Sequence, residues 1–240
     1  MSNFLLAAKN TVQPPLAHQT AAWNWLWDNV SVEDRATFLD KFRSDPPAKP
    51  SLSVQLNVPF DSQNDNASGT GYRECFSSSC AMVARFWKRV ASDDAYNVIR
   101  SRYGDTTDAM AQVKALQSMN LDARFVTNAS VTLIENELRN GRPTAVGWLH
   151  HGSSLNPTGG GHWSVLTGFD NQFYTVNDPN GEANLISGGY ISSAGGRGQR
   201  YSRLNFNRRW LVDGPIAVGR FYANRSLPTM IEPNALALKS

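Results

Sequence analysis

A change of hydrophobic period near residue 142 constrains the fold of this chain more than any other feature. Before that point, apolar residues recur at helical spacing and predict helices over residues 75–90, 93–103, 106–119 and 131–140. After it, segments rich in Val, Thr, Trp, Phe and Tyr predict strands over residues 143–150, 162–170 and 172–179. Helices followed by antiparallel strands predict an α+β domain.

Local signals add detail to this outline. Thr106 or Thr107 is expected to cap the third helix, while Ser130 caps the fourth and Gly141 ends it. Residues 121–126 predict a short strand, and residues 208–222 predict further strand material. A Gly- and Ser-rich loop is expected over residues 186–198.

The first 50 residues predict a separate module. Residues 13–43 have the pattern of a helical hairpin, and residues 44–51 form a proline-rich linker, so we expect a hairpin module over 1–50 and a main domain over 51–240. Trp23, Trp25 and Trp27 cannot all share one helix face. They either pack against the main domain or dock to a cell wall, a glycan or a partner protein.

Charge and targeting signals narrow the class of protein. The net charge is +3, and the Lys and Arg residues are scattered, which argues against nucleic-acid binding. Residues 197–209 are the densest basic stretch. They either form a solvated face or attract an anionic wall or membrane polymer weakly. We see no signal peptide and no membrane-spanning stretch, so we expect synthesis in the cytoplasm and action on the cell wall only after release.

The two cysteines are expected to be free thiols. On one helix, the Cα atoms of Cys75 and Cys80 would lie about 8.5 Å apart, beyond the reach of a disulfide of roughly 7 Å. Cys75 opens a helix, where the dipole and the backbone N–H groups favour the reactive thiolate. Without a partner base, however, it is equally consistent with a buried structural cysteine.

A histidine and an aspartate are candidate partners for Cys75. His162 starts a strand directly after three glycines, and Asp178 ends the next strand. With a tight turn centred between Asp170 and Asn171, Asp178 would lie opposite Trp163, beside His162. Each residue also has a structural interpretation, as a partly exposed histidine and as a turn residue before proline. Together they match the arrangement that nucleophilic catalysis needs.

The residues around these three positions resemble a known family. The segments VPFDSQNDN, RECFSSSCAMV, GGHWSVLTGFD and YTVNDPNG resemble the papain-like cysteine peptidases of the bacteriocin-processing, double-glycine type, in their broader peptidase-like branch. The resemblance runs from about residue 58 to 178, and the rest of the sheet would extend to about residue 222.

The resemblance implies roles for four residues. Cys75 would be the nucleophile, His162 the general base and acid, and Asp178 the acid that orients the imidazole. The side chain of Gln63, with the backbone N–H of Cys75, would form the oxyanion hole. Cys80 falls at an apolar core position.

The sequence departs from the family pattern in two places. Phe76 and Ser77 follow the nucleophile where the family commonly has Gly and Pro, and the stretch between Gln63 and Cys75 is longer than usual. Asn64 or Asn66 is therefore an alternative donor to the oxyanion.

Other residues are candidates for contact with substrate. We expect Tyr72, His151, Gly161 and Trp163 to contact it, with Trp148, Trp163, Phe169 and Tyr174 forming core or cleft wall. His150 and His151 near His162 invite a metal interpretation. Adjacent strand residues point to opposite faces, however, so we expect neither a metal nor a cofactor.

Three functions follow from this reading. The first is a cysteine peptidase that hydrolyses bacterial peptidoglycan peptides, as a phage-type lysin does. The second is a peptidase that trims a leader from a protein. The third is a catalytically inactive, peptidase-like binding module.

Overall fold

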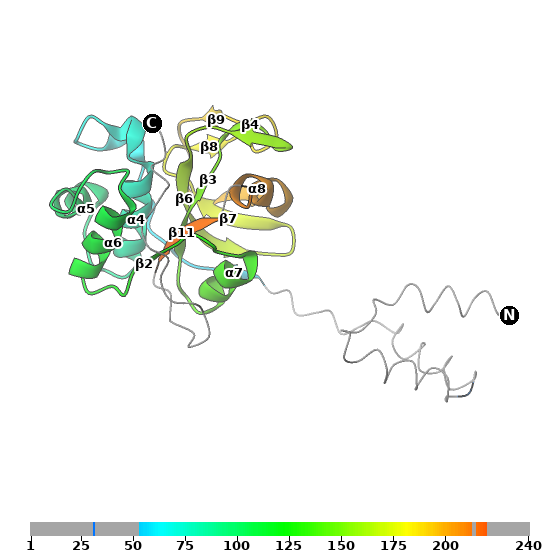
Figure 1. Cartoon of the computed structure of the whole chain (residues 1–240), viewed down its shortest axis with the longest axis horizontal. Coiled ribbons are helices and arrows are strands. Elements are labelled where there is room, and N and C mark those ends of the chain that lie inside the picture. The colour runs from blue at the N-terminus through cyan, green and yellow to red at the C-terminus, as the bar shows by residue number, and fades with distance from the viewer. Residues whose placement is uncertain (1–30, 32–52, 213–214, 220–240) are drawn as a thin grey trace. The chain divides into compact units, whose positions relative to one another are not determined.

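The structure is a computed structural model that describes residue 31, residues 53–212 and residues 215–219 (Figure 1). The expected helical hairpin, the linker with its domain boundary, and any strand beyond residue 219 lie outside the described residues. None of the described helices is both long enough and apolar enough to cross a lipid bilayer.

The described domain is α+β, as expected from the sequence. Its central sheet is antiparallel, with strand order β10-β7-β6-β3-β11-β2, and β1 also pairs with β6. The strands are β1 (Val54–Gln55), β2 (Arg124–Val126), β3 (Thr144–Trp148), β6 (His162–Phe169), β7 (Phe173–Asn177), β10 (Gln199–Ser202) and β11 (Ile216–Gly219). Two small hairpins stand apart from this sheet, β4 (His151–Ser153) with β5 (Asn156–Thr158), and β8 (Glu182–Ala183) with β9 (Tyr190–Ser192).

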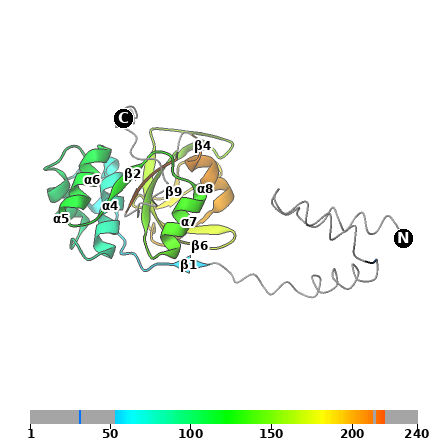
Figure 2. The same ribbon diagram turned by 60° about the horizontal axis from the view of Figure 1, so that its bottom comes forward.

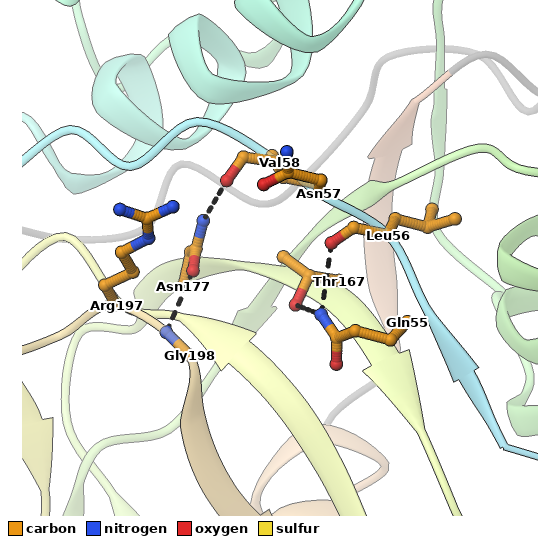
Figure 3. A pocket seen from close by; sticks show the side chains of 8 residues that line it. All are labelled: Gln55, Leu56, Asn57, Val58, Thr167, Asn177, Arg197 and Gly198. Atoms are coloured by element: carbon orange, nitrogen blue, oxygen red, sulfur yellow. Dashed lines mark hydrogen bonds between the residues drawn. The ribbon is translucent and has the colours of Figure 1, made fainter.

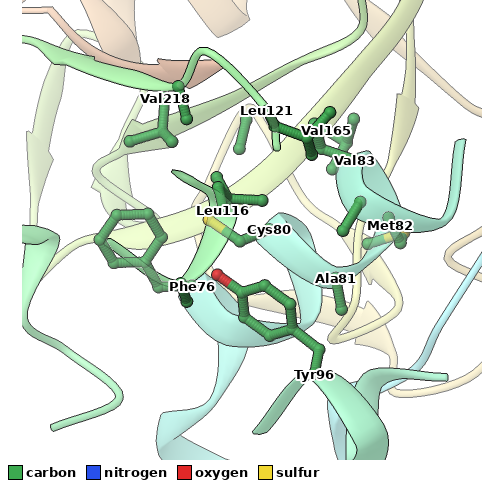
Figure 4. Packing of buried hydrophobic residues seen from close by; sticks show 14 of the residues in the cluster. Phe76, Cys80, Ala81, Met82, Val83, Tyr96, Leu116, Leu121, Val165 and Val218 are labelled. Atoms are coloured by element: carbon green, nitrogen blue, oxygen red, sulfur yellow. The ribbon is translucent and has the colours of Figure 1, made fainter. Parts of the chain in front are cut away.

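Helices cover both faces of the sheet. Figures 1 and 2 show α4 (Cys75–Phe86), α5 (Asp93–Arg100) and α6 (Ala109–Ser118) grouped on one side of it. Their core includes Val165 and Cys80 (Figure 4), together with Trp163. A second core contains residues of α7 (Val131–Arg139) and α8 (Arg203–Trp210), together with Leu166 and Trp148. Alternate residues of β6 thus enter different cores, and all eight are buried.

Helix caps follow the sequence at one position and differ at another. The Ser130 hydroxyl accepts from the backbone N–H of Leu133 at 3.1 Å, and Gly141 has a φ of +72°, as expected for the two ends of α7. The cap predicted at Thr106 or Thr107 is wrong, because α6 starts at Ala109 and Asp108 caps it. Neither threonine is available. The Thr107 hydroxyl bonds to Asp105, and that of Thr106 is buried against Ser77.

The segment predicted as strand over residues 208–222 begins as a helix. Residues 208–210 are the end of α8, and only Ile216–Gly219 forms a strand within the described part of this segment. The helix is selected by tertiary contacts. Phe206 and Trp210, four residues apart, share a buried face, and the buried guanidinium of Arg209 donates to the carbonyls of Leu185, Leu149, His151 and Gly152.

The β6–β7 hairpin differs from its predicted register. Asp170 N–H donates to the Phe173 carbonyl at 2.9 Å, so the turn is centred on Asn171 and Gln172 instead of on Asp170 and Asn171. The Asp170 carboxylate supports this turn by accepting from the N–H groups of Gln172 and Phe173, both at 2.8 Å. The register then shifts between Leu166 and Gly168, which leaves Thr167 as the extra residue of a β-bulge.

Candidate active site

Cys75 is the first residue of α4, and a buried glutamate precedes it. The Glu74 side chain accepts hydrogen bonds from Thr70 Oγ1 at 2.7 Å, from Asn97 Nδ2 at 3.3 Å, and from Asn66. Burial works to raise the pKa of Glu74, but the bonds from Asn66 and Thr70 outweigh it and leave the pKa below its usual value. Glu74 therefore ties the preceding loop and α5 to the start of α4. Nothing in the local sequence marks Glu74 for this role.

Cys75 and Cys80 are both free thiols, as expected, but their environments differ. Cys75 is partly exposed, whereas Cys80 is completely buried beside Tyr96 (Figure 4). Burial raises the pKa of Cys80 far above its ordinary value, so this thiol is inert. Only Cys75 is both accessible and hydrogen-bonded to an imidazole.

The imidazole of His162 connects Cys75 with Asp178. Its Nε2 lies 2.8 Å from Asp178 Oδ1, and its ring also hydrogen-bonds to the Cys75 side chain. Trp148 and Tyr190 meet the ring edge to face, with centroids 5.4 and 5.6 Å away. These contacts leave His162 only 4% exposed and hold the plane of its ring.

The charge state of His162 is set by its two partners. Burial lowers the pKa of His162, but the charges of Asp178 and Cys75 and their hydrogen bonds raise it from the usual 6.5 to about 10. The imidazolium form is therefore favoured at neutral pH. A protonated histidine beside a thiol at a helix N-terminus favours the thiolate form of that thiol.

Asp178 is fully buried and surrounded by hydrogen-bond donors. Besides His162, the carboxylate accepts from Asn180 N–H at 3.1 Å, from Tyr201 Oη at 2.9 Å and from Tyr190 Oη at 3.3 Å. Because donors surround both oxygens, the anion is compensated despite its burial. The two tyrosines are not predicted from the sequence, because nothing local marks a residue 12 or 23 positions away as a partner of Asp178.

The three amides proposed for the oxyanion hole have different partners. Gln63 is buried, and its Nε2 donates to the Gly71 carbonyl at 2.9 Å. This bond leaves a second N–H hydrogen on Nε2 for another acceptor. Asn66 is committed to Glu74 and Ser78, whereas Asn64 donates to the Ser193 carbonyl at 3.3 Å. Gln63 thus keeps more of its donor capacity than Asn66.

The residues expected to contact substrate are placed differently from one another. Trp163 is 3% exposed and stacks on Phe76 at 3.7 Å, so its indole belongs to the core and does not line an open surface. Tyr72 is 81% exposed and lies just before Cys75, on η3 (Gly71–Arg73). His151 is exposed, and Gly161 has a φ of +92°, a conformation that favours glycine directly before His162.

The prediction that His150 and His151 point to opposite faces is wrong. Their ring centroids lie 4.0 Å apart, because His150 precedes β4 and is not part of the strand. The His150 ring lies 5.7 Å from the His162 ring. Burial, together with His162 and His151, lowers the pKa of His150 to about 4, so His150 is neutral at neutral pH.

A pocket of about 240 Å³ is lined by eight residues, among them Asn177, the residue before Asp178 (Figure 3). Asn177 Nδ2 donates to the carbonyls of Val58 and Pro59 at 3.2 and 3.3 Å, and its Oδ1 accepts from Gly198 N–H at 3.0 Å. These bonds join β7 to the segment that leads to Gln63. None of Cys75, His162 and Asp178 lines the pocket.

The chain is similar to one protein family in sequence and to several solved structures in fold. Residues 55–210 match the sequence model of the peptidase C39-like family, which confirms the resemblance inferred from the sequence. A C39-like peptidase from Bacillus anthracis has a similar fold, with a TM-score of 0.52 and 15% identity over 71% of this chain and 98% of that one. No curated protein matches the chain.

Two further solved structures align less closely. One is a double-glycine motif protease from an AMS/PCAT transporter in complex with a leader peptide, with 20% identity, a TM-score of 0.45, and coverage of 70% of this chain and 95% of that one. The other is the peptidase domain of Streptococcus ComA, with 20% identity, a TM-score of 0.42, and coverage of 69% and 96%.

Proposed function

Since the chain belongs to the peptidase C39-like family, we propose that it is a cysteine peptidase whose catalytic triad is Cys75, His162 and Asp178. One observation carries the proposal. The His162 ring bonds to Asp178 at 2.8 Å on one side and to the Cys75 side chain on the other. This is the order of contacts that a nucleophile, a general base and an orienting acid require.

The reaction proceeds in two halves. The Cys75 thiolate attacks the carbonyl carbon of the scissile peptide bond, and the carbonyl oxygen takes the negative charge. His162 then donates its proton to the leaving nitrogen, the C–N bond breaks, and the amine departs from a thioester. In the second half, His162 removes a proton from water, the resulting hydroxide attacks the thioester, and the carboxylic product leaves Cys75 as the thiolate.

Gln63 and the backbone N–H of Cys75 are the proposed donors to the oxyanion. The Cys75 N–H is free of an intrahelical partner because it belongs to the first turn of α4. The second hydrogen on Gln63 Nε2 would supply the other bond. Tyr72, exposed beside the nucleophile, and His151 are the side chains proposed to contact the substrate on either side of the bond.

Peptidoglycan peptides are the substrate we propose first. The chain carries a net charge of +3, and bacterial walls contain anionic polymers that would attract it. Cleavage of a protein leader after glycine is the second candidate, and it is favoured by membership of the C39-like family. The two substrates share the same chemistry and differ only in what lies next to the scissile bond.

The test compares wild type with Cys75→Ala and with Cys80→Ala, a matched control whose thiol is buried and inert. Purified walls, and peptides in which two glycines are followed by further residues, are incubated with each protein, and mass spectrometry identifies the fragments. We expect hydrolysis by wild type and Cys80→Ala, and none by Cys75→Ala. Fragments from walls alone establish the lysin, and fragments from peptides alone establish the processing peptidase.

The third hypothesis, an inactive binding module, makes the opposite prediction. Wild type would then leave both substrates intact, and iodoacetamide would modify Cys75 no faster than an ordinary thiol. Rapid alkylation of Cys75 without hydrolysis would show a competent site whose substrate is neither of the two.

A further inference from the structure

Two tyrosines outside the family's triad contact the carboxylate of Asp178. Tyr190 is the first residue of β9, and Tyr201 lies on β10. Both strands follow Asp178 in the sequence. Tyr201 is 3% exposed, and Tyr190 is partly buried with its ring edge to face against His162. We propose that Tyr201, assisted by Tyr190, is a positioning residue that holds the Asp178 carboxylate in the orientation that His162 requires. This inference rests on the proposed function.

The direction of the Tyr201 hydrogen bond is determined by its neighbours. The backbone N–H of Ala183 donates to Tyr201 Oη at 2.9 Å, which occupies the hydroxyl as an acceptor. Its own hydrogen is then free, and the acceptors within reach are Asp178 Oδ2 at 2.9 Å and the Gly181 carbonyl at 3.5 Å. The shorter bond, to a charged oxygen, is the stronger one. Tyr201 therefore donates to Oδ2.

The two carboxylate oxygens are held by different groups. Oδ1 accepts from His162 and Asn180, while Oδ2 accepts from Tyr201, and Tyr190 Oη lies 3.3 Å from Oδ1 and 3.5 Å from Oδ2. If Oδ2 lost its short bond, the carboxylate could turn about its χ2 axis, because that torsion is broad for Asp. Such a turn would move Oδ1 away from His162 Nε2.

Both hydroxyls remain donors over the whole range of pH in which the enzyme can be assayed. Burial, followed by the charge of Asp178, raises the pKa of Tyr190 and of Tyr201 well above the ordinary value for tyrosine. The other titratable groups that face this cluster are Cys75 from α4, His162 from β6, His150 before β4, and Glu182 from β8. Neither tyrosine is a proton donor or acceptor in the reaction.

The variants that test the proposal remove only the hydroxyl groups. Tyr201→Phe and Tyr190→Phe keep the rings, and Tyr174→Phe is the matched control. Tyr174 is a buried tyrosine whose hydroxyl bonds to Asn207 Oδ1 at 3.1 Å and not to Asp178. Each substitution removes one hydroxyl group. Tyr201→Phe also leaves the Ala183 N–H without its acceptor, so the free energy of unfolding is measured for all three variants.

The first measurement is the rate at which iodoacetamide alkylates Cys75 as a function of pH, with the modified residue located by mass spectrometry. If Tyr201 positions Asp178, its loss weakens the stabilisation of the imidazolium that accompanies the thiolate. We expect the acid limb of the profile to move to higher pH by about one unit in Tyr201→Phe, by less in Tyr190→Phe, and not at all in Tyr174→Phe. This measurement needs no substrate, so it tests the proposal even if the proposed peptidase activity fails.

A second measurement is the pKa of His162, read from the imidazole nitrogen signals of protein with labelled histidine. A fall in Tyr201→Phe relative to Tyr174→Phe supports the positioning role. A rise would mean that the hydroxyl only withdraws charge from the carboxylate, and no change would mean that the tyrosine is merely structural. Either result overturns the proposal. On a cleaved peptide, we expect kcat to fall about 10- to 100-fold in Tyr201→Phe with KM unchanged.

Discussion

His162 is the first residue of β6 and Asp178 directly follows β7, and the two are diagonal partners across these antiparallel strands, with Nε2 and Oδ1 2.8 Å apart. Val165 pairs with Asn177, so the continued register sets Asp178 opposite Ser164, two residues from His162 and on the same face. In the register predicted from the sequence, Asp178 would lie opposite Trp163. The Trp163 side chain enters the core formed with α4, which also contains Val165 and Cys80. The bulge at Thr167 therefore contributes to the meeting of these two side chains.

The charge of Asp178 can be tested with the isosteric variant Asp178→Asn. We expect kcat/KM to fall about 1,000-fold or more, because the amide neither stabilises the imidazolium nor selects the tautomer that faces Cys75. Asp170→Asn is the control, since Asp170 supports the β6–β7 turn and does not contact the triad. Its kcat/KM should stay within about twofold of wild type. Equal losses in both variants would show that the effect comes from the hairpin and not from the charge.

Protonation of His162 should appear in the pH dependence of stability. Its pKa is about 10 in the folded protein, against 6.5 for an ordinary histidine, so folding favours the protonated form. The stabilisation is complete below pH 6.5 and disappears as the pH rises through 10. Urea unfolding between pH 6.5 and 10 measures this effect. The free energy of unfolding should fall more steeply in wild type than in His162→Gln. Parallel curves would contradict the assigned protonation state.

The loop that contacts the Asp178 carbonyl requires glycine at position 196 and only favours glycine at position 195. A Cβ on Gly196 would lie 1.9 Å from the Asp178 carbonyl oxygen, which accepts a hydrogen bond from Gly181. Gly196→Ala must displace backbone at Asp178, so we expect a loss of activity of about 100-fold. Gly195→Ala meets no atom within 4 Å and has only the strain of a φ of +74°, which costs about 1 kcal/mol.

The comparison is made by measuring kcat/KM and the free energy of unfolding for both glycine variants. Gly195→Ala should lose stability and keep its activity. If Gly196→Ala were as active as Gly195→Ala, the position of the Asp178 backbone would not matter for catalysis.

The oxyanion role of Gln63 can be separated from its structural role. We expect Gln63→Ala to lower kcat about 100- to 1,000-fold, which is the usual effect of removing one oxyanion donor. It also removes the bond to the Gly71 carbonyl, so the free energy of unfolding should fall by about 1 kcal/mol. Asn64→Ala tests the alternative donor. Its kcat should stay near that of wild type, because Asn64 Nδ2 already donates to the Ser193 carbonyl. Similar values of kcat in the two variants would remove Gln63 from the proposed oxyanion hole.

Local features of the sequence were sufficient to predict much of the fold. The change from helical to alternating period indicated the α+β domain, and Ser130 and Gly141 mark the ends of α7. Cys75 was expected to open a helix, and it does. These predictions succeed because period, capping and helix starts depend on residues within a few positions of one another.

Tertiary structure decided what local pattern does not encode. Residues 208–210 became helix because Phe206 and Trp210 are buried in one core and the buried Arg209 guanidinium donates to the Leu185 carbonyl. Trp163 was expected to contact substrate, but its position on β6 turns it toward Phe76 in the core. The buried side chain of Glu74 ties the loop before Cys75 to α5 through Asn97, which lies 23 residues away in the sequence.

The same division holds at the candidate site. Cys75, His162 and Asp178 could be selected as candidates from the sequence, because helix starts, strand starts and turns are local. Their meeting, and the hydroxyl groups of Tyr190 and Tyr201 on Asp178, depended on the bulge and on strands β9 and β10. A one-residue change of register reverses the face of every side chain in a strand, and only the packing of the whole sheet selects among registers.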